Sequence, residues 1–184
     1  AAIDKYTFIT VNRRKLDHLI RASYSKTEIV GSVDEIQHPL IREALRLTGI
    51  DGGVEITSIG DVPGGSGLGT SGSFAVGLLN ALHTLQREHI SPHQLAEEAC
   101  KIEIEILQEP VGKHDQYLAA WGGITCLDID RTGHVSTFPA KISDDVLEEF
   151  ERNIVLFYTG IARRSSEVLA DQNAASNEDE PCVI

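Results

Sequence analysis

A glycine-rich segment, residues 63–71, separates two stretches of opposite pattern. The stretch 54–59 alternates between apolar and polar residues, which predicts a strand. The stretch 73–85 predicts a buried helix, because its apolar residues fall on all sides at helical spacing. Those residues are Phe74, Val76, Leu78, Leu79, Leu82 and Leu85. Any fold of this chain must therefore place a strand, a glycine loop and a buried helix in succession.

Glycines in such a loop let backbone N–H groups turn toward one point, and the helix N-terminus behind them adds its dipole. We therefore expect a phosphate-binding loop that needs no basic residue. The alternative is a flexible glycine turn without a ligand. The residues predicted to bind phosphate are Pro63, Gly64, Gly65, Ser66, Gly67, Leu68, Gly69, Thr70 and Ser71. The hydroxyls of Thr70 and Ser71 can also bind a magnesium ion.

Two better-known phosphate loops do not fit this segment. A Walker A loop needs a Gly-Lys-Ser/Thr sequence, and no lysine lies between Asp61 and Leu85. The glycines at 67, 69 and 72 do match the dinucleotide fingerprint. That fingerprint also needs a second strand ending in an acidic residue about 20 residues later. The stretch 87–92 is instead expected to join two helices, so we interpret the match as accidental.

Composition excludes some classes of partner. The net charge of −12 argues against nucleic acid as a partner, which usually requires a basic face. No apolar run reaches the roughly 20 residues of a membrane helix, and the first six residues resemble no signal peptide. We therefore expect no membrane partner and a cytoplasmic location. The three widely spaced cysteines, at 100, 126 and 182, are expected to be reduced thiols.

The order of predicted elements is mixed. Strands are expected at 6–11, 27–30, 54–59 and 153–158, and a hairpin of 124–129 and 135–138 around a turn at 130–133. Helices are expected at 39–47, 73–85, 92–107, 144–150 and 165–170, and 17–23 is expected to be a connection. Helices between strand pairs predict an α+β fold rather than a doubly wound sheet.

One carboxylate in the predicted helix 92–107 falls on the wrong face. The apolar arc of this helix consists of Leu95, Ala96, Ala99, Cys100, Ile102, Ile106 and Leu107. Glu103 lies in the middle of that arc at about 100° per residue. Burying a carboxylate costs roughly several kcal/mol unless it is paired with another group or binds a metal. The alternative is a helix that is rotated or frays early, which would leave Glu103 at a wet margin.

A second carboxylate follows in the segment 109–117, which we expect to be a tight, exposed connection. Asp115 is twelve residues after Glu103, a spacing that can bring both to one site as base and metal ligand. Lys113 could supply positive charge to a phosphate or lower the pKa of Asp115. The alternative for Asp115 is a turn former or helix cap. His114 has no partner at a useful spacing and is interpreted as structural.

These residues together resemble the small-molecule kinases typified by galactokinase, homoserine kinase and mevalonate kinase, the GHMP kinase family. The loop Pro-x-x-x-Gly-Leu-Gly-Thr-Ser at 63–71 resembles the family's second motif. The segment Gly-Lys-His-Asp-Gln at 112–116 resembles its Gly-x-x-Asp-Gln element, and Trp-Gly-Gly at 121–123 its aromatic-Gly-Gly element. Glu103 stands where the family places a magnesium-binding Glu, and Thr70 where it usually has a magnesium-contacting Ser.

The resemblance implies a fold and two ligands. It implies a ribosomal-protein-S5-domain-2-like N-terminal domain at 1–145 and the beginning of a ferredoxin-like C-terminal domain at 146–184. It implies that ATP and Mg²⁺ are bound, with Glu103 and Thr70 holding the metal. Asp115, with Lys113, would then be catalytic, accepting the proton of a sugar hydroxyl.

Within the family, the chain is most similar to the branch that acts on D-glycero-D-manno-heptose 7-phosphate. The stretches 2–6, 77–82, 102–107 and 157–163 carry this similarity. It implies phosphorylation of the anomeric hydroxyl of a sugar phosphate, with Gly160, Arg163 and Arg164 as further substrate contacts beside Asp115. A fucose or galactose kinase is the alternative within the family. The resemblance leaves the formation of a homodimer open.

The chain also departs from the family pattern. The family's first motif should precede Ala1 and its third should follow Ile184, so we expect a fragment of a longer kinase. Gly72 stands where a serine is commoner. A fragment without the flanking motifs could bind a nucleotide and do no chemistry, which is the rival interpretation.

Overall fold

The computed structural model describes residues 1–157 and residue 160. The strands in this part of the chain are β1 (Thr7–Arg13), β2 (Ile20–Ser23), β3 (Thr27–Val30), β4 (Val54–Gly60), β5 (Thr125–Ile129) and β6 (Val135–Pro139). The α-helices are α1 (Pro39–Thr48), α2 (Thr70–Gln86), α3 (Pro92–Cys100), α4 (His114–Trp121) and α5 (Asp144–Arg152). A 3-10 turn (η1, Val33–Glu35) and a π-helical segment (η2, Lys101–Ile106) complete the described elements.

Four strands form one mixed sheet in the order β1-β4-β2-β3. β1 and β3 run antiparallel to their neighbours, and β2 runs parallel to β4. The expectation that 17–23 is a connection is wrong, because Ile20 and Ala22 are fully buried in a central strand. The strand has four residues, and only two of them point into the core. So short an alternation of apolar and polar residues cannot be distinguished from a loop in the sequence.

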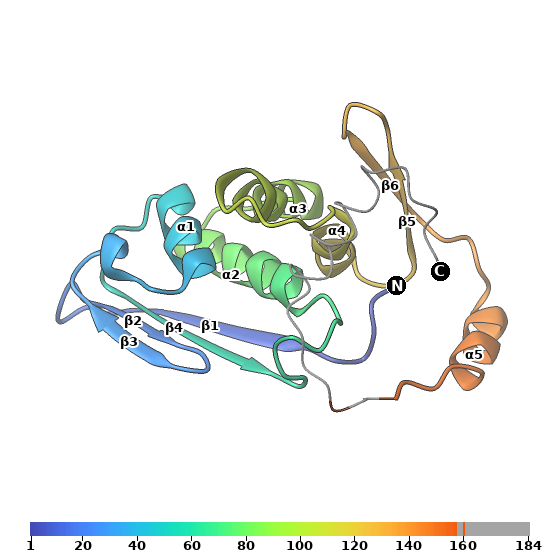
Figure 1. Cartoon of the computed structure of the whole chain (residues 1–184), viewed down its shortest axis with the longest axis horizontal. Coiled ribbons are helices and arrows are strands. Elements are labelled where there is room, and N and C mark those ends of the chain that lie inside the picture. The colour runs from blue at the N-terminus through green and yellow to red at the C-terminus, as the bar shows by residue number, and fades with distance from the viewer. Residues whose placement is uncertain (158–159, 161–184) are drawn as a thin grey trace, which may run out of the picture.

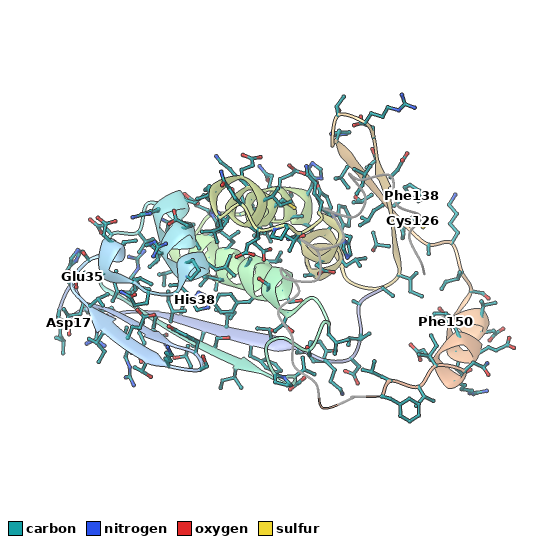
Figure 2. All side chains as sticks on the ribbon, viewed as in Figure 1. Asp17, Glu35, His38, Cys126, Phe138 and Phe150 are labelled. Carbon is teal, nitrogen blue, oxygen red and sulfur yellow. The ribbon has the colours of Figure 1, made fainter. Side chains whose placement is uncertain are left out.

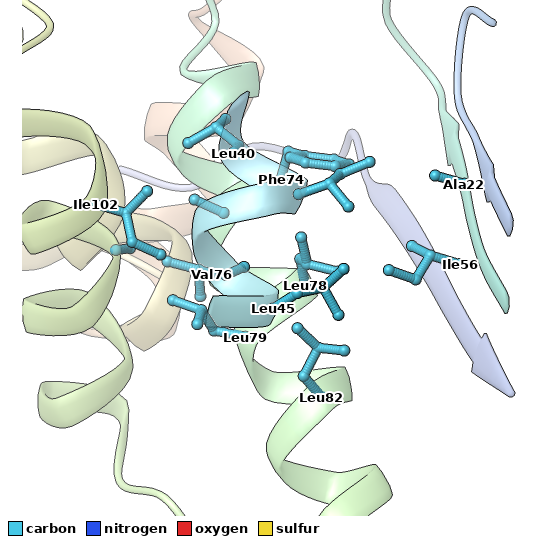
Figure 3. Close-up of a cluster of buried hydrophobic side chains, with 14 of the residues drawn as sticks. Ala22, Leu40, Leu45, Ile56, Phe74, Val76, Leu78, Leu79, Leu82 and Ile102 are labelled. Atoms are coloured by element: carbon cyan, nitrogen blue, oxygen red, sulfur yellow. The ribbon is translucent and has the colours of Figure 1, made fainter. Parts of the chain in front are cut away.

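Helices cover one face of this sheet (Figure 1). α1 and α2 lie next to the sheet, and α3 and α4 pack against α2 on its side away from the sheet. The predicted buried helix is confirmed. Leu78, Leu79 and Leu82 of α2 are fully buried, between β4 on one side and α1 and η2 on the other (Figure 3). The helix starts at Thr70, three residues earlier than predicted, so its first turn belongs to the glycine loop.

Local signals set the ends of two other helices as expected. α1 has Pro39 at its first position and ends on Gly49, whose φ of 68° is left-handed. α3 starts with a capping box, in which the Ser91 side chain accepts from the Gln94 backbone and the Gln94 side chain accepts from the Ser91 backbone.

The predicted single helix 92–107 is instead an α-helix followed by the π-helical turns of η2. The backbone N–H of Leu107 donates to the carbonyl of Ile102, five residues back, at 2.9 Å. Because a π-helical turn holds more residues than an α-helical turn, the last residues of this segment point in other directions than an α-helix predicts. Ile106, predicted to lie on the apolar arc, is 44% exposed, while Glu103 is buried.

The remaining elements confirm part of the prediction. β5 and β6 pair as the expected hairpin, and α5 covers the expected helix at 144–150. The expected strand 153–158 is wrong over its described part: residues 153–157 pair with no strand that the structure describes, and Phe157 is 81% exposed. An extended segment without a neighbouring strand has no hydrogen-bond ladder.

The expected helix 165–170 lies outside the described residues. Of the helices in the described part of the chain, none is long and apolar enough to span a bilayer.

Candidate functional site

The predicted phosphate loop leaves the end of β4 and turns directly into α2. Gly67 and Gly69 have φ values of 76° and 66°, a left-handed conformation that side chains rarely allow. Gly69 is the N-cap residue of α2, so the free N–H groups of the first helical turn begin at the loop's end. The loop therefore has the backbone geometry of an anion-binding helix N-terminus.

The start of α2 lies directly against Asp115. A Cβ atom built on Gly69 would come within 3.1 Å of the Asp115 Cγ atom. One built on Gly72 would lie 3.1 Å from the Asp115 Cβ atom and 3.1 Å from the Gln116 backbone nitrogen. The glycines at these two positions are what allow the carboxylate to approach the loop this closely.

Asp115 lies in the first turn of α4 and not in a loop as expected. No side chain caps this helix at Lys113, so the sequence carries no local signal for its start. Packing against α2 and α3 orders the segment instead.

Glu103 is buried, at 2% exposure, which excludes the alternative of a carboxylate at a wet margin. Its Oε1 atom accepts a hydrogen bond from the Ser71 hydroxyl at 2.5 Å, and its Oε2 atom accepts one from the Gln116 amide at 2.6 Å. Burial raises the pKa of Glu103; the two hydrogen bonds oppose this change, and the neighbouring Asp115 carboxylate adds to it. The structure thus brings Glu103 to the first turn of α2.

Of the two hydroxyls at the start of α2, the one that contacts Glu103 belongs to Ser71. The Thr70 hydroxyl lies 3.3 Å from the hydroxyl of Ser66, within the loop. The family resemblance had implied that Glu103 and Thr70 hold the metal ion together. Because neighbouring helical residues point about 100° apart, only one of the two can face η2.

Two cavities of about 400 Å³ each meet at this point. The first cavity lies between the N-terminal segment 1–7, α2 and α4. The second cavity lies between the loop, η2 and the start of α4, and includes Glu103 and Ser71. Gly69, Thr70 and Asp115 line both. Asp115 is therefore placed where groups bound in the two cavities would meet.

A third cavity, of about 500 Å³, lies on the sheet side of the loop and was not foreseen from the sequence. Three aromatic side chains line it. The ring of His38, at the start of α1 (Figure 2), lies 4.6 Å from that of Tyr24 and 5.2 Å from that of Phe74, between centroids. Burial lowers the pKa of His38. Such a neutral aromatic wall suits a flat apolar ring.

The other predicted site residues are placed differently. The ammonium of Lys113 donates to the carbonyl of Gly133 at 2.8 Å and lies 3.5 Å from Glu97 Oε1, so it is not brought to Asp115. His114, interpreted as structural, does reach the site: its Nε2 atom is 3.2 Å from Asp115 Oδ1.

The substrate contacts predicted at the C-terminal end are less defined. Gly160 is described, with a left-handed φ of 76°, while the predicted contacts Arg163 and Arg164 lie outside the described residues.

The described residues contain no group of three His, Cys, Asp or Glu side chains that could by itself hold a metal ion. They do fit a magnesium ion that takes its other oxygens from phosphate. Glu103 offers a carboxylate and Ser71 a hydroxyl at one point of the second cavity. The buried Oε1 atom of Gln116, which lines the same cavity, has no hydrogen-bond partner among these residues.

Residues 35–123 match the family described as the GHMP kinases N terminal domain. The chain is 32% identical over 108 residues to D-glycero-alpha-D-manno-heptose 7-phosphate kinase from Campylobacter jejuni, a match that covers 59% of this chain and 32% of the relative. It is 28% identical over 194 residues to galactokinase from Pyrococcus furiosus, which covers 96% of this chain and 51% of the relative. The chain thus matches about a third to a half of the length of these relatives.

Solved structures show the same fold. A D-glycero-D-manno-heptose 1-phosphate kinase from Bacteroides thetaiotaomicron aligns with a TM-score of 0.76 at 23% identity, covering 94% of this chain and 61% of that one. Galactokinase from Lactococcus lactis aligns with a TM-score of 0.63 at 18% identity, covering 99% and 52%. The mixed α+β fold expected from the sequence is confirmed: an N-terminal domain of this type with the start of a second domain.

Proposed function

Residues 35–123 match the N-terminal domain of the GHMP kinases, and we propose that the chain is a kinase of this family that transfers the γ-phosphoryl group of ATP to the anomeric hydroxyl of a sugar phosphate. The observation that carries this proposal is the position of Asp115. It lies against the glycines at the start of α2 and lines both cavities on the two sides of the loop. A carboxylate at such a junction is suited to act between a nucleotide and an acceptor.

The nucleotide is proposed to lie along the loop. The N–H groups of the loop and of the first turn of α2 hold the β- and γ-phosphates, with the helix dipole adding to the attraction. The third cavity shares Gly65, Thr70 and Ser71 with the second, so one molecule can extend from one to the other. The adenine ring would then lie against His38 and Phe74.

Glu103 and Ser71 are proposed to hold a magnesium ion, with Thr70 as the further predicted ligand. When bound, the ion neutralises charge on the phosphate oxygens. A carboxylate whose pKa is raised by burial gains from a cation beside it, because the cation offsets the desolvation of its ionised form.

The acceptor is proposed to occupy the first cavity. Asp115 accepts the proton of the anomeric hydroxyl while that oxygen forms a bond to the γ-phosphorus. The bond from the γ-phosphorus to its bridging oxygen breaks, and ADP leaves with the electron pair. Such a transfer depends chiefly on alignment and on neutralising charge, and both would come from the loop and the carboxylates around it.

The proposed acceptor is D-glycero-D-manno-heptose 7-phosphate, which would become the 1,7-bisphosphate. The similarity to the Campylobacter jejuni heptose 7-phosphate kinase supports this choice. Matches to a galactokinase and to a Bacteroides fragilis L-fucokinase/L-fucose-1-P guanylyltransferase keep galactose and fucose as alternatives. Gly160, Arg163 and Arg164 remain predicted contacts of the sugar phosphate, and Lys113 remains a predicted aid to Asp115.

The test is a coupled assay of ADP release by the chain with heptose 7-phosphate, galactose and fucose in parallel. Asp115→Asn is expected to lower kcat by about 100- to 10,000-fold, the range of a lost general base, and to leave ATP binding by calorimetry intact. The matched control is Asp51→Asn, which changes the same groups at a side chain that is 91% exposed. Its kcat should equal that of the wild type.

Three outcomes separate the hypotheses. Turnover with heptose 7-phosphate and loss in Asp115→Asn support the proposal. Wild-type turnover in Asp115→Asn would remove Asp115 as the base. ATP binding without turnover of any of the three sugars would favour the rival function, a nucleotide-binding unit without chemistry.

A further inference from the structure

Cationic side chains are scarce around the glycine loop. Of the described lysines and arginines, Lys5 is the one that lines any of the three cavities. It lines the first cavity, together with Asp115. The protein has a net charge of −12, so the positive charge of Lys5 is opposite in sign to the charge of the protein as a whole.

The backbone on either side of Lys5 is fixed. The N–H of Ala2 donates to the carbonyl of Gly123, just after α4, at 2.8 Å. The N–H of Tyr6 donates to Asp61 Oδ2, and the N–H of Asp61 donates to the carbonyl of Tyr6, both at 2.9 Å. The segment therefore crosses between the end of α4 and the end of β4, and it carries Lys5 along the wall of the first cavity.

The rest of this wall suits a polyol. Thr70, Ser73 and Asn80 line it from α2 and offer neutral groups that can bond hydroxyls. Val76 and Leu118 give it an apolar side, against which the C–H face of a sugar can pack. Lys5 supplies the positive charge that these groups lack.

The other lysine that the sequence predicted for the site, Lys113, is already engaged. Its ammonium donates to the carbonyl of Gly133 and is paired with Glu97. The phosphates of a nucleotide, in turn, can be held by the N–H groups of the loop. A positive charge in the first cavity is therefore free for a different anion.

We propose that Lys5 is a specificity-determining residue, which binds the anionic phosphate substituent of the sugar held in the first cavity. This inference rests on the proposed function for the identity of the acceptor, and it adds the residue that would separate a phosphorylated sugar from a neutral one. An ammonium–phosphate contact is a charge-assisted hydrogen bond, and its loss weakens only the ligand that carries the phosphate.

The test is a binding measurement without ATP. Affinities of the 184-residue chain for D-mannose 6-phosphate and for D-mannose are measured by NMR titration of the ¹⁵N-labelled protein. The wild type is expected to bind the phosphorylated sugar at least about tenfold more tightly, a factor typical of one charge-assisted contact. Lys5→Gln should remove this preference and leave the affinity for D-mannose unchanged, and Lys5→Arg should keep most of it.

Lys15→Gln is the matched control, because Lys15 is exposed and lines none of the three cavities. It should behave as the wild type. An undiminished preference in Lys5→Gln, or a wild type that binds the two sugars equally or binds neither, would overturn the inference. A Lys5-dependent preference in a chain that releases no ADP would leave the inference standing while the proposed function fails.

Discussion

Gly72 has no side chain at the point where α2 meets α4. It stands in the family's second motif where a serine is commoner, and the sequence alone offers no reason for the change. In the structure, a Cβ at this position would lie 3.1–3.2 Å from three atoms of Asp115 and Gln116, two of them in the backbone. The glycine is therefore a packing requirement of the contact between the loop helix and the proposed base.

Gly72→Ala should destabilise the protein. Overpacking against backbone atoms costs about 1–3 kcal/mol, while alanine in a helix recovers up to about 1 kcal/mol relative to glycine. We expect a net loss of about 1–2 kcal/mol in the free energy of unfolding, measured by urea denaturation. Gly64→Ala is the control, since a Cβ there meets no atom within 4 Å. Equal stabilities of the two variants would contradict the close approach.

The proposed site depends on how α2 and α3 are held side by side. His83 joins them: its Nδ1 atom lies 2.7 Å from Glu88 Oε2 in the connection, and its Nε2 atom lies 2.9 Å from Glu98 Oε2 in α3. The imidazole is 11% exposed, and a ring bonded to two carboxylates favours its doubly protonated form. Because α2 starts at the glycine loop and α3 continues into η2 with Glu103, this contact stabilises the pair of helices that carry the site.

The His83 contact predicts a pH-dependent stability. Burial alone would lower the pKa of His83, but the hydrogen bonds and charges of Glu88 and Glu98 outweigh it, and the pKa is raised above its ordinary 6.5. The folded state thus binds the proton more tightly than the unfolded state. The stabilisation is fully present below pH 6.5 and is lost as the pH rises through the raised pKa.

Urea unfolding as a function of pH measures this effect. The free energy of unfolding of the wild type should fall across that window, because the folded state holds the His83 proton more tightly than the unfolded state. Glu98→Gln should flatten the fall, and Glu105→Gln, at an exposed position of η2, should not. A fall of the same size in Glu98→Gln would exclude His83 as its source.

At the scale of the whole molecule, the helices α1 to α4 lie on one face of the four-stranded sheet and leave its other face open (Figure 1). β4 shows the difference within one strand. Ile56 points to the helices and is fully buried, while Ile59 points to the open face and is 65% exposed, opposite Phe8 of β1. The hydrophobic contribution to stability therefore comes from one face of the sheet.

This architecture predicts opposite outcomes for the same substitution. Ile56→Ala should lower the free energy of unfolding by about 2–5 kcal/mol, because it opens a cavity between β4 and α2. Ile59→Ala should change it by less than about 1 kcal/mol. Thermal or urea unfolding of the two variants checks both values. A large loss in Ile59→Ala would mean that the open face is covered in solution.

Patterns within about ten residues determined much of this protein. The glycine loop, the buried helix after it and the misplaced Glu103 were all predicted from the sequence, because each is a local property of spacing and polarity. Family resemblance extended these patterns to a kinase fold. Elements without a strong local pattern were missed, as β2 and the π-helical turns of η2 show.

Only the tertiary structure decided how these parts meet. In the structure, Ser71 and not Thr70 donates a hydrogen bond to Glu103, which is 32 residues away in the chain. Lys113 donates to the carbonyl of Gly133. Lys5 and Asp115 both line the first cavity. Such contacts depend on the packing of helices that are distant in the chain, which short-range spacing does not encode. The sequence thus determined which chemical groups are present, and the packing of α2, η2 and α4 determined which of them act together.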